Sequence, residues 1–372
     1  MNDEPTFRCG GYTFSLSGHQ ESVEAMAELM VDLSCESGSP RTQWHFSCHG
    51  SLRTVRIDGE VILSELPSRL MPAQVVSLLT RQVLDHESTL LHIHAAAVVE
   101  NDQAMFVAGT SGAGKSTLCA ALVSSGWAYL TDEIVSVHPA TLEVSSFPKP
   151  ISVKKYAIGA VGRIAQIDVP PERSAPWMVP ASTLGQLAAA NRHDVRTIVS
   201  YQFRQGGDSV LEPLHRATMV RELMADGQDA LRMGEQALLV TSQLAARANC
   251  LSATSGDAAE LSTLLRDAHD DAYPLGSLTP IGPADSAGAG PRRSERASSL
   301  ILDGRALIFD AAAGQIIELD EATTTWWALF DGSPLDAVAG EHAEAFAVSS
   351  SRSRHLAHRA IDRLQALDLL VV

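Results

Sequence analysis

Long apolar runs are missing from this chain of 372 residues. No uninterrupted stretch approaches the roughly 18–20 apolar residues that a membrane-spanning helix requires, so a helical membrane protein is excluded and no membrane partner is expected. The first five residues, Met1 to Pro5, are acidic where a secretory signal would be basic and then apolar. We therefore expect a cytoplasmic protein.

Cysteine and positive charge are also scarce. The 5 cysteines are scattered without the paired spacing of a zinc site or a disulfide framework, so we expect them to be reduced and structural. The chain has 28 Lys and Arg against 44 Asp and Glu, a formal net charge of −16. Nucleic-acid binding normally needs a basic surface that releases counterions, so no nucleic-acid partner is expected.

The residue types change along the chain, and these changes divide it into four predicted regions of different structure. Residues 1–88 contain short strand-like segments and a helix-like segment, and we interpret them as a β-rich scaffold. Residues 89–272 alternate strands and helices and form the predicted nucleotide domain. Residues 273–298 are rich in Pro, Gly, Ser and Ala, a composition typical of a flexible linker. Residues 299–372, three strands and then three helices, form the predicted C-terminal domain.

The sharpest pattern lies between His92 and Val137. It predicts a strand from His94 to Val99 and a second strand from Gln103 to Ala108, joined by a polar turn into a hairpin. A glycine-rich loop then opens a helix that begins at Lys115, and a strand follows at Trp127 to Leu130. Further helices are predicted at Ala181 to Asn191, Ala217 to Asp226, Gly234 to Ala248 and Asp257 to Ala268.

The segment Gly109 to Ser116 fits the phosphate-binding pattern G-x-x-x-x-G-K-[ST], with a strand before it and a helix after it. Glycines let the backbone N–H groups point at phosphate oxygens, and the helix N-terminus adds about half a positive charge there. Lys115 would reach the β and γ phosphates, and the Ser116 hydroxyl would join a Mg²⁺ shell. The predicted ATP-binding residues are Gly109, Thr110, Ser111, Gly112, Ala113, Gly114, Lys115, Ser116 and Thr117.

An acid pair, Asp132-Glu133, ends the strand after this helix, where strand ends beside a phosphate loop face the phosphates. A carboxylate there can bind Mg²⁺ or take the proton of an attacking hydroxyl, which contributes about 10²- to 10⁴-fold. We assign Asp132 as the base and Glu133 as a metal or water ligand. His94 either tunes an acid or is a structural histidine. With His92 it makes a poor zinc site, because further ligands are lacking nearby.

These residues resemble the HPr kinase/phosphorylase superfamily, whose P-loop fold is related to that of phosphoenolpyruvate carboxykinase. The resemblance is carried by His94-Ala-Ala-Ala-Val-Val, by the P-loop and by Leu130-Thr-Asp132-Glu133. It implies one active site in which His94, Lys115 and Asp132 are catalytic, with Asp132 as the base toward a serine hydroxyl.

The chain also departs from that family. It has no Glu-x-Arg-Gly-Leu-Gly segment, and the comparable region is Lys149-Pro-Ile-Ser-Val-Lys-Lys-Tyr. It is therefore more similar to the HPr kinase-like proteins of peptide natural-product pathways. Lys149 is a candidate phosphate contact, against the commoner solvated lysine, and Arg204 is a weaker candidate for charge stabilisation.

A second resemblance, to the PqqD family, lies in the C-terminal part. It is carried by Leu302 to Asp310, Gly314 to Asp320 and Ala322 to Gly332, within a region from about Arg296 to Val372. PqqD proteins are small winged-helix-like modules that recognise leader peptides of ribosomally made precursors. The resemblance implies that a peptide adds to an open edge strand at Gln315 to Leu319, beside a helix at Arg359 to Leu370. A dimerisation or DNA-binding wing is the alternative, which the acidity of the domain disfavours.

Together, these features predict an α/β P-loop kinase domain of the HPr kinase/phosphoenolpyruvate carboxykinase type, with a β-rich N-terminal segment and a C-terminal α+β winged-helix-like domain. The predicted activity is phosphorylation of a Ser or Thr of a precursor peptide by ATP and Mg²⁺, with the tethered C-terminal domain raising the local peptide concentration. An ATP-hydrolysing peptide-delivery module and a small-molecule kinase remain alternatives. The oligomeric state is left open, a homo-oligomer included.

Overall fold

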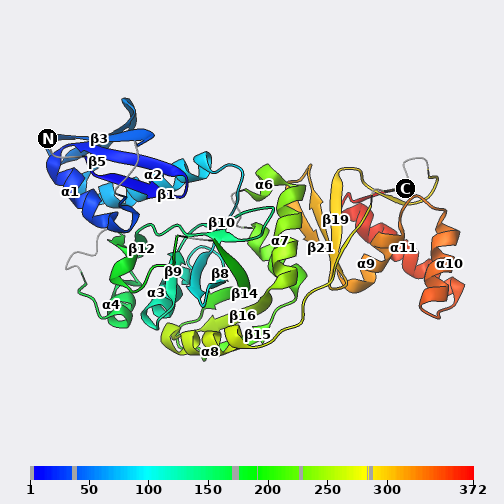
Figure 1. Ribbon diagram of the computed structural model, residues 1–372. Helices are drawn as coiled ribbons and strands as arrows, with labels where there is room; N and C mark the ends of the chain where they lie inside the picture. Colours follow the sequence, from blue (N-terminus) through cyan, green and yellow to red (C-terminus); the bar gives the residue numbers. More distant parts are fainter. Residues whose placement is uncertain are drawn as a thin grey trace. The chain divides into compact units, whose positions relative to one another are not determined.

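The computed structural model describes residues 4–35, 40–169, 176–190, 192–225, 229–282, 284 and 288–372 (Figure 1). The chain forms two compact units, both with mixed α/β structure. The first comprises Met1–Glu212 with Leu251–Ala272, and the second comprises Pro213–Cys250 with Tyr273–Val372. This division crosses the domain boundaries predicted from the sequence, because a helical segment from the middle of the chain belongs with the C-terminal residues.

The described residues of the first 88 include a five-stranded sheet in the order β1-β2-β3-β4-β5, in which β2 and β3 are parallel and the other neighbours antiparallel. Trp44 and Phe46 alternate with exposed neighbours on β3 and are buried together with residues of α1 and α2. Ile134 and Phe147 belong to the same core cluster, so this sheet is part of the first unit. The elements are β1 Thr6–Cys9, β2 Tyr12–Gly18, α1 Gln20–Leu29, β3 Thr42–His49, β4 Leu52–Ile57, β5 Glu60–Pro67 and α2 Met71–His86.

A nine-stranded sheet forms the centre of the first unit. Its main path is β6-β10-β11-β14-β8-β7-β9, and β16 pairs with both β14 and β15. The strands are β6 Leu91–Ile93, β7 Ala96–Glu100, β8 Gln103–Ala108, β9 Ala128–Thr131, β10 Val135–Val137, β11 Val144–Ser145, β14 Arg192–Phe203, β15 Val210–Pro213 and β16 Asn249–Ser255.

Strand direction brings the predicted site residues to one edge of this sheet. β7 is antiparallel to both of its neighbours, and Ala97 lies opposite Phe106 of β8 on one side and Thr131 of β9 on the other. The carboxyl ends of β8 and β9 therefore lie at the same edge as the start of β7. The predicted hairpin of β7 and β8 is confirmed, and it places His94, the P-loop and the acid pair at a common edge.

Two helices and a strand pair surround the P-loop helix in the first unit. Helix α3 (Lys115–Ser124) packs against α4 (Ile158–Ala165) and α8 (Ala258–Asp270). Strand β12 (Ile151–Val153) pairs with β13 (Trp177–Val179). Seven of the ten residues of α3 are buried, which fits the apolar run from Leu118 to Val123.

The helix predicted at Ala181 to Asn191 is wrong. The segment holds only a short 3-10 turn at Ala181–Thr183, and Asn191 lies outside the described residues. Its backbone instead pairs with β9, where Tyr129 donates to the carbonyl of Gln186 and accepts from the N–H of Ala188. Tertiary pairing has replaced the local helical preference here.

The second unit contains a four-stranded antiparallel sheet in the order β17-β19-β20-β21. Ala306 and Ile308 of β20 face the core with α9 and α11, whereas α5 and α7 pack on the opposite face (Figure 1). The C-terminal domain predicted from the sequence therefore did not include α5 and α7, the helices that pack on this face of the sheet. The elements are α5 Arg216–Ala225, α6 Ala230–Met233, α7 Glu235–Arg247, β17 Leu278–Pro280, β18 Arg292–Arg293, β19 Ala297–Leu302, β20 Arg305–Asp310, β21 Gln315–Glu318, α9 Glu321–Leu329, α10 Leu335–Ala345, α11 Ser350–Ala366 and β22 Leu370–Val371.

The flexible linker predicted at residues 273–298 is wrong for the residues that the structure describes. It supplies two strands, β17, which pairs with β19, and β18, which pairs with β22. The buried guanidinium of Arg293 donates to the carbonyl oxygens of Trp327, Ala328 and Phe330 near the end of α9. Residues 283 and 285–287 of the predicted linker lie outside the described part.

The predicted peptide-contacting helix at Arg359 to Leu370 is divided between the end of α11 and strand β22. Helix α11 also carries an exposed basic face, although the overall acidity of the domain was the argument against a DNA-binding wing. The arginines of that face are Arg352, Arg359 and Arg363. Among the described residues, no helix is long and apolar enough to cross a bilayer.

Candidate functional site

The P-loop links β8 to α3 in a conformation that requires glycine. Gly109 has φ 145°, and a Cβ there would stand 2.4 Å from the carbonyl oxygen of Tyr201. Gly114 is the left-handed N-cap of α3. Phe203, at the end of β14, donates its N–H to the carbonyl of Ala113, which ties the loop to the neighbouring strand. The loop is thereby held open at the N-terminus of a buried helix, where an anion is stabilised.

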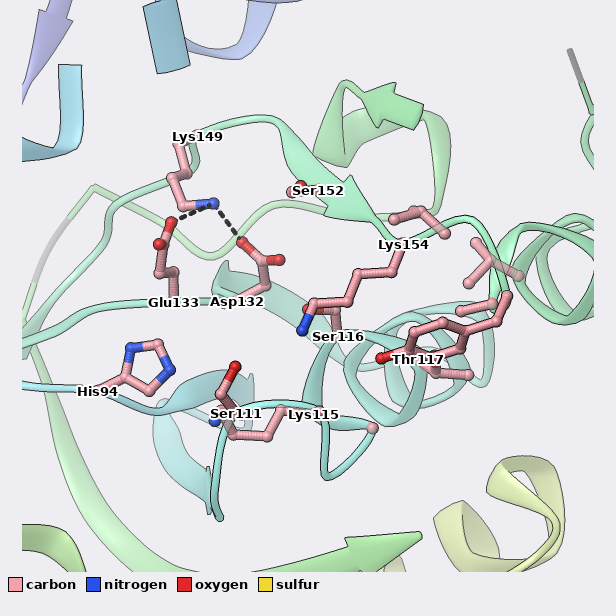
Figure 2. A pocket seen from close by; sticks show the side chains of 16 residues that line it. His94, Ser111, Lys115, Ser116, Thr117, Asp132, Glu133, Lys149, Ser152 and Lys154 are labelled. Atoms are coloured by element: carbon pink, nitrogen blue, oxygen red, sulfur yellow. Dashed lines mark hydrogen bonds and ion pairs between the residues drawn. The ribbon is translucent and has the colours of Figure 1, made fainter. Parts of the chain in front are cut away.

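The loop, the acid pair and His94 line one pocket of about 200 Å³ (Figure 2). His94, Ser111 and Lys115 lie on one side of it, with Asp132, Glu133 and Lys149 opposite. The predicted site residues that line it are His94, Ser111, Gly112, Gly114, Lys115, Ser116, Thr117, Asp132 and Glu133. Gly109, Thr110 and Ala113 shape the loop and are not among the lining residues.

Lys115 is folded back onto the loop that it follows. Its side-chain Nζ donates to the carbonyl oxygens of Gly109, at 2.5 Å, and Thr110, at 3.4 Å, and the residue is only 7 % exposed. The ammonium is therefore solvated by backbone dipoles in this state. A bound phosphate would offer it charged oxygens in place of these neutral ones, and such bonds are roughly twice as strong.

The acid pair is held by a buried lysine. Lys149 is 1 % exposed, and its Nζ lies 2.6 Å from Asp132 Oδ1 and 3.0 Å from Glu133 Oε2. Burial alone lowers the pKa of Lys149, but the two carboxylates outweigh burial and raise this pKa to about 12. Lys149 is thus a charged partner of the acids, and its interpretation as a solvated lysine is wrong.

Tyr129 adds a second donor to the same carboxylate. Its hydroxyl donates to Asp132 Oδ1 at 3.2 Å and lies 3.1 Å from the carbonyl oxygen of Lys149. Burial, and then the negative charge of Asp132, raise the pKa of Tyr129 well above its usual value, so the phenol stays a neutral donor. Oδ1 of Asp132 is therefore occupied twice, while Oδ2 takes no part in these contacts and is the oxygen available to accept a proton.

The two histidines of the His-x-His segment have different surroundings. His94 lines the pocket. His92 is buried outside it, with Nδ1 3.0 Å from Ser136 Oγ and Nε2 3.2 Å from the carbonyl oxygen of Glu87. The segment therefore does not present two metal ligands to one point. In the described part of the chain, no group of three or more His, Cys, Asp or Glu side chains is arranged to hold a metal ion.

Oxygen donors of the kind that Mg²⁺ prefers nevertheless line the pocket. The Ser116 hydroxyl and the carboxylates of Asp132 and Glu133 open onto the same space as the P-loop. In phosphate sites Mg²⁺ keeps several waters and takes phosphate oxygens, so one or two protein ligands suffice. The residues present therefore fit Mg²⁺ delivered together with a nucleotide.

For Arg204 and Lys154, the structure differs from what the sequence predicted. Arg204, the weaker candidate for charge stabilisation, is exposed and is not among the pocket-lining residues. Lys154 lines the pocket and was missed. A signal was present, because Lys154 lies two residues after Ser152, directly after a short strand, but the strand itself was not predicted.

Comparisons with known proteins give little guidance. No family model and no curated protein matches the sequence. The structure is similar to the HPr(Ser) kinase/phosphatase from Coxiella burnetii, with a TM-score of 0.24 and 15% identity, over 48% of this chain and 95% of that chain. A TM-score this low carries no weight for fold or function. The resemblance of the C-terminal part to PqqD proteins stays a prediction.

Proposed function

We propose that this chain is an ATP- and Mg²⁺-dependent kinase that phosphorylates a Ser or Thr hydroxyl of a ribosomally made precursor peptide. One observation supports the proposal above all. The P-loop and a carboxylate with one engaged and one available oxygen, Asp132, line the same pocket. Phosphoryl transfer requires little more than positioning, charge stabilisation and a group that accepts the hydroxyl proton.

The P-loop residues would bind the nucleotide. The backbone N–H groups of Gly109 to Ser116 and the Lys115 ammonium hold the phosphates, and the dipole of α3 adds to their positive potential. Ser116 and Glu133 would hold Mg²⁺ together with phosphate oxygens, and the ion would supply positive charge that balances the phosphates. Asp132 lines the same pocket as these residues.

Asp132 would act as the general base. The acceptor hydroxyl gives its proton to Oδ2 of Asp132 as its oxygen forms a bond to the γ-phosphorus, and the bond from that phosphorus to ADP breaks. Lys149 and Tyr129 fix the carboxylate through Oδ1, at 2.6 Å and 3.2 Å. They are positioning residues, because they act through the carboxylate of Asp132.

The acceptor class is argued from the second unit. β21 lies at one edge of the four-stranded sheet, so its outer backbone groups suit pairing with an extended peptide. Glu318 of β21 is bound by Arg305 of the same sheet at 2.9 Å and by Arg221 of α5 at 3.1 Å, which fixes the strand. A peptide held at this edge would reach the kinase site at raised effective concentration.

Incubation of the full chain with γ-labelled ATP, Mg²⁺ and a synthetic precursor peptide tests the proposal. The expected product is labelled peptide, absent from a Lys115→Met sample, since that variant lacks the phosphate-binding ammonium. Labelled free phosphate without labelled peptide would favour the peptide-delivery alternative. Label on a small hydroxyl compound, unaffected by peptide, would favour a small-molecule kinase.

A further inference from the structure

The pocket receives another lysine from the wall formed by β12. Ile151 and Val153 of this strand are buried in the core of the first unit. Alternate residues of a strand point to opposite faces, so Ser152 lies on the other face of β12; Lys154 directly follows the strand, and both line the pocket. In Figure 2, the Lys154 side chain extends from the end of β12 toward Ser116 at the start of the P-loop helix.

The backbone at Lys154 is fixed on both sides. Val153 pairs with Trp177 of β13, and the carbonyl oxygen of Lys154 accepts the N–H of Ala157 at 2.8 Å, in the turn before α4. The root of the side chain is therefore placed at the pocket rim. Only the four-carbon stem is free to adjust to a ligand.

The charges of the pocket distinguish Lys154 from the other two lysines that line it. Lys149 is engaged by two carboxylates, and Lys115 donates to carbonyl oxygens of its own loop. Within the part of the chain that the structure describes, the Lys154 ammonium forms no hydrogen bond or ion pair. Its charge is thus available to an anion that enters between β12 and the P-loop.

Building on the proposed function, we infer that Lys154 binds the terminal phosphate of the nucleotide and stabilises the transferring phosphoryl group. Negative charge on that group must be balanced while its bond to ADP breaks and its bond to the acceptor oxygen forms. The acceptor proton passes to Asp132, and Lys154 keeps its own proton throughout. Lys115 and the α3 N-terminus serve the phosphates from the loop side, and Lys154 serves them from β12.

Lys155 provides a matched control for Lys154. Both are exposed lysines at neighbouring positions, but Lys155 is not among the pocket-lining residues. Replacing either one by Met removes the same charge and keeps a stem of similar length. A general loss of positive potential would weaken binding in both variants, whereas a direct phosphate contact is lost only in Lys154→Met.

Calorimetric titration of the full chain with Mg²⁺ and either ADP or the non-hydrolysable β,γ-imido analogue of ATP tests the inference. Lys154→Met is expected to weaken binding of the triphosphate analogue at least about tenfold, the loss of one charge-assisted hydrogen bond, and of ADP less than about twofold. Lys155→Met should change neither affinity. Thermal melting checks that both variants remain folded.

Equal weakening for both nucleotides, no weakening for the triphosphate, or the same loss in Lys155→Met would overturn the role of Lys154. The proposed kinase activity fails in a different way. A wild-type chain that binds the triphosphate through Lys154 but never labels a peptide or small hydroxyl compound overturns the kinase proposal and keeps the phosphate contact. A wild-type chain that binds neither nucleotide overturns both.

Discussion

At the scale of single residues, the most informative group is Asp132 with its two donors. A carboxylate held through one oxygen by Lys149 and Tyr129 keeps a fixed orientation, which a general base needs. The arrangement also makes the proposed base part of a buried ion pair. Buried pairs add little net stability when complete, but removing one partner leaves an uncompensated charge and is costly.

Asp132→Asn should separate catalysis from binding. The amide cannot take the hydroxyl proton, so peptide phosphorylation is expected to fall by at least about 100-fold, within the usual range for a general base. Mg²⁺–ATP affinity, measured calorimetrically, should stay within about threefold if Glu133 and Ser116 are the metal ligands. Asp208→Asn, an exposed acid outside the pocket-lining set, is the control. A collapse of ATP affinity would instead make Asp132 a metal ligand.

Lys149→Met is expected to lower the free energy of unfolding by about 3–5 kcal/mol, because Asp132 would be left buried without its cation. The pKa of Lys149 rises from 10.5 to about 12 on folding, so its stabilising contribution is complete below pH 10.5 and is lost as the pH rises through 12. Urea titrations of both proteins at neutral and high pH measure this. A stability gap between them that persists unchanged above pH 12 would contradict the ion-pair account.

At the scale of elements, a buried arginine orders the segment that the sequence predicted to be a linker. Arg293 of β18 places its guanidinium at the carbonyl end of α9, where helix carbonyls lack partners, and lies over the Trp327 ring at 6.0 Å. Burial lowers the pKa of Arg293 without removing its charge at neutral pH. A Pro- and Gly-rich segment can therefore be ordered when one residue in it satisfies several backbone acceptors.

Arg293→Met is expected to lower the free energy of unfolding by about 2–4 kcal/mol, since it leaves buried carbonyl oxygens near the end of α9 unsatisfied. Chemical denaturation followed by tryptophan fluorescence measures the loss, because Trp326 and Trp327 lie in this core. Arg352→Met, at an exposed position of α11, should cost less than about 0.5 kcal/mol. Equal costs for the two variants would show that β18 does not depend on Arg293.

The packing of α8 against β14 contains a histidine that resists protonation. His269 lies edge-on to Trp127, its Nδ1 is 2.9 Å from Thr197 Oγ1, and its buried Nε2 has no partner within the described chain. Burial, and then the Arg196 guanidinium, lower its pKa from 6.5 to about 4. The folded state binds fewer protons at His269 than the unfolded state between these pH values, so stability is full above pH 6.5 and is lost toward pH 4.

His269→Gln should remove this pH dependence. The shift from 6.5 to about 4 corresponds to on the order of 3 kcal/mol, so the wild type should lose that much more stability than the variant between pH 6.5 and 4. Urea titrations across this range provide the comparison. His358→Gln, at an exposed position of α11, is the control and should follow the wild type. Parallel curves for wild type and His269→Gln would contradict the prediction.

At the scale of the whole molecule, the second unit is made of two separated stretches of chain. Residues Pro213–Cys250 supply α5, α6 and α7, and Tyr273–Val372 supply the sheet with α9 to α11. A chain shortened after Asp270 would keep α5 and α7 but lose the sheet against which they pack. The nucleotide domain predicted at residues 89–272 therefore includes helices that belong to the second unit.

A different deletion should give a stable first unit. Residues Pro213–Cys250 leave the first unit and return to it through the paired strands β15 and β16. The two ends of this segment are close, since Leu214 donates to the carbonyl of Cys250 at 2.9 Å. Joining Glu212 to Leu251 by an Asn-Gly turn and ending at Ala272 should give a folded chain that binds Mg²⁺–ATP within about threefold of the wild type, because every pocket-lining residue lies in this unit. The chain that ends at Asp270 should aggregate instead. Size-exclusion chromatography and calorimetry compare them, and a folded first unit without nucleotide affinity would contradict the prediction.

The sequence by itself determined the local features of this protein. The P-loop was predicted because the spacing of its glycines and its lysine matches the phosphate-binding pattern. The β7–β8 hairpin and helices α3, α5, α7 and α8 were predicted from short-range periodicity. The order of His94, P-loop and acid pair was also visible. Their convergence follows from strand direction, because two reversals of the chain return the ends of β8 and β9 to the edge where β7 begins.

Only the tertiary structure decided the features that depend on contacts between distant residues. From the sequence, a lysine in a Pro-rich segment is expected to be solvated. Folding buries Lys149 against two carboxylates, and no local sequence pattern indicates that burial. The same holds for Arg293 in the predicted linker and for the helices that pack on the sheet of the second unit. Burial and ion pairing depend on which segments pack together, and the free energy of that packing outweighs the local conformational preferences of the sequence.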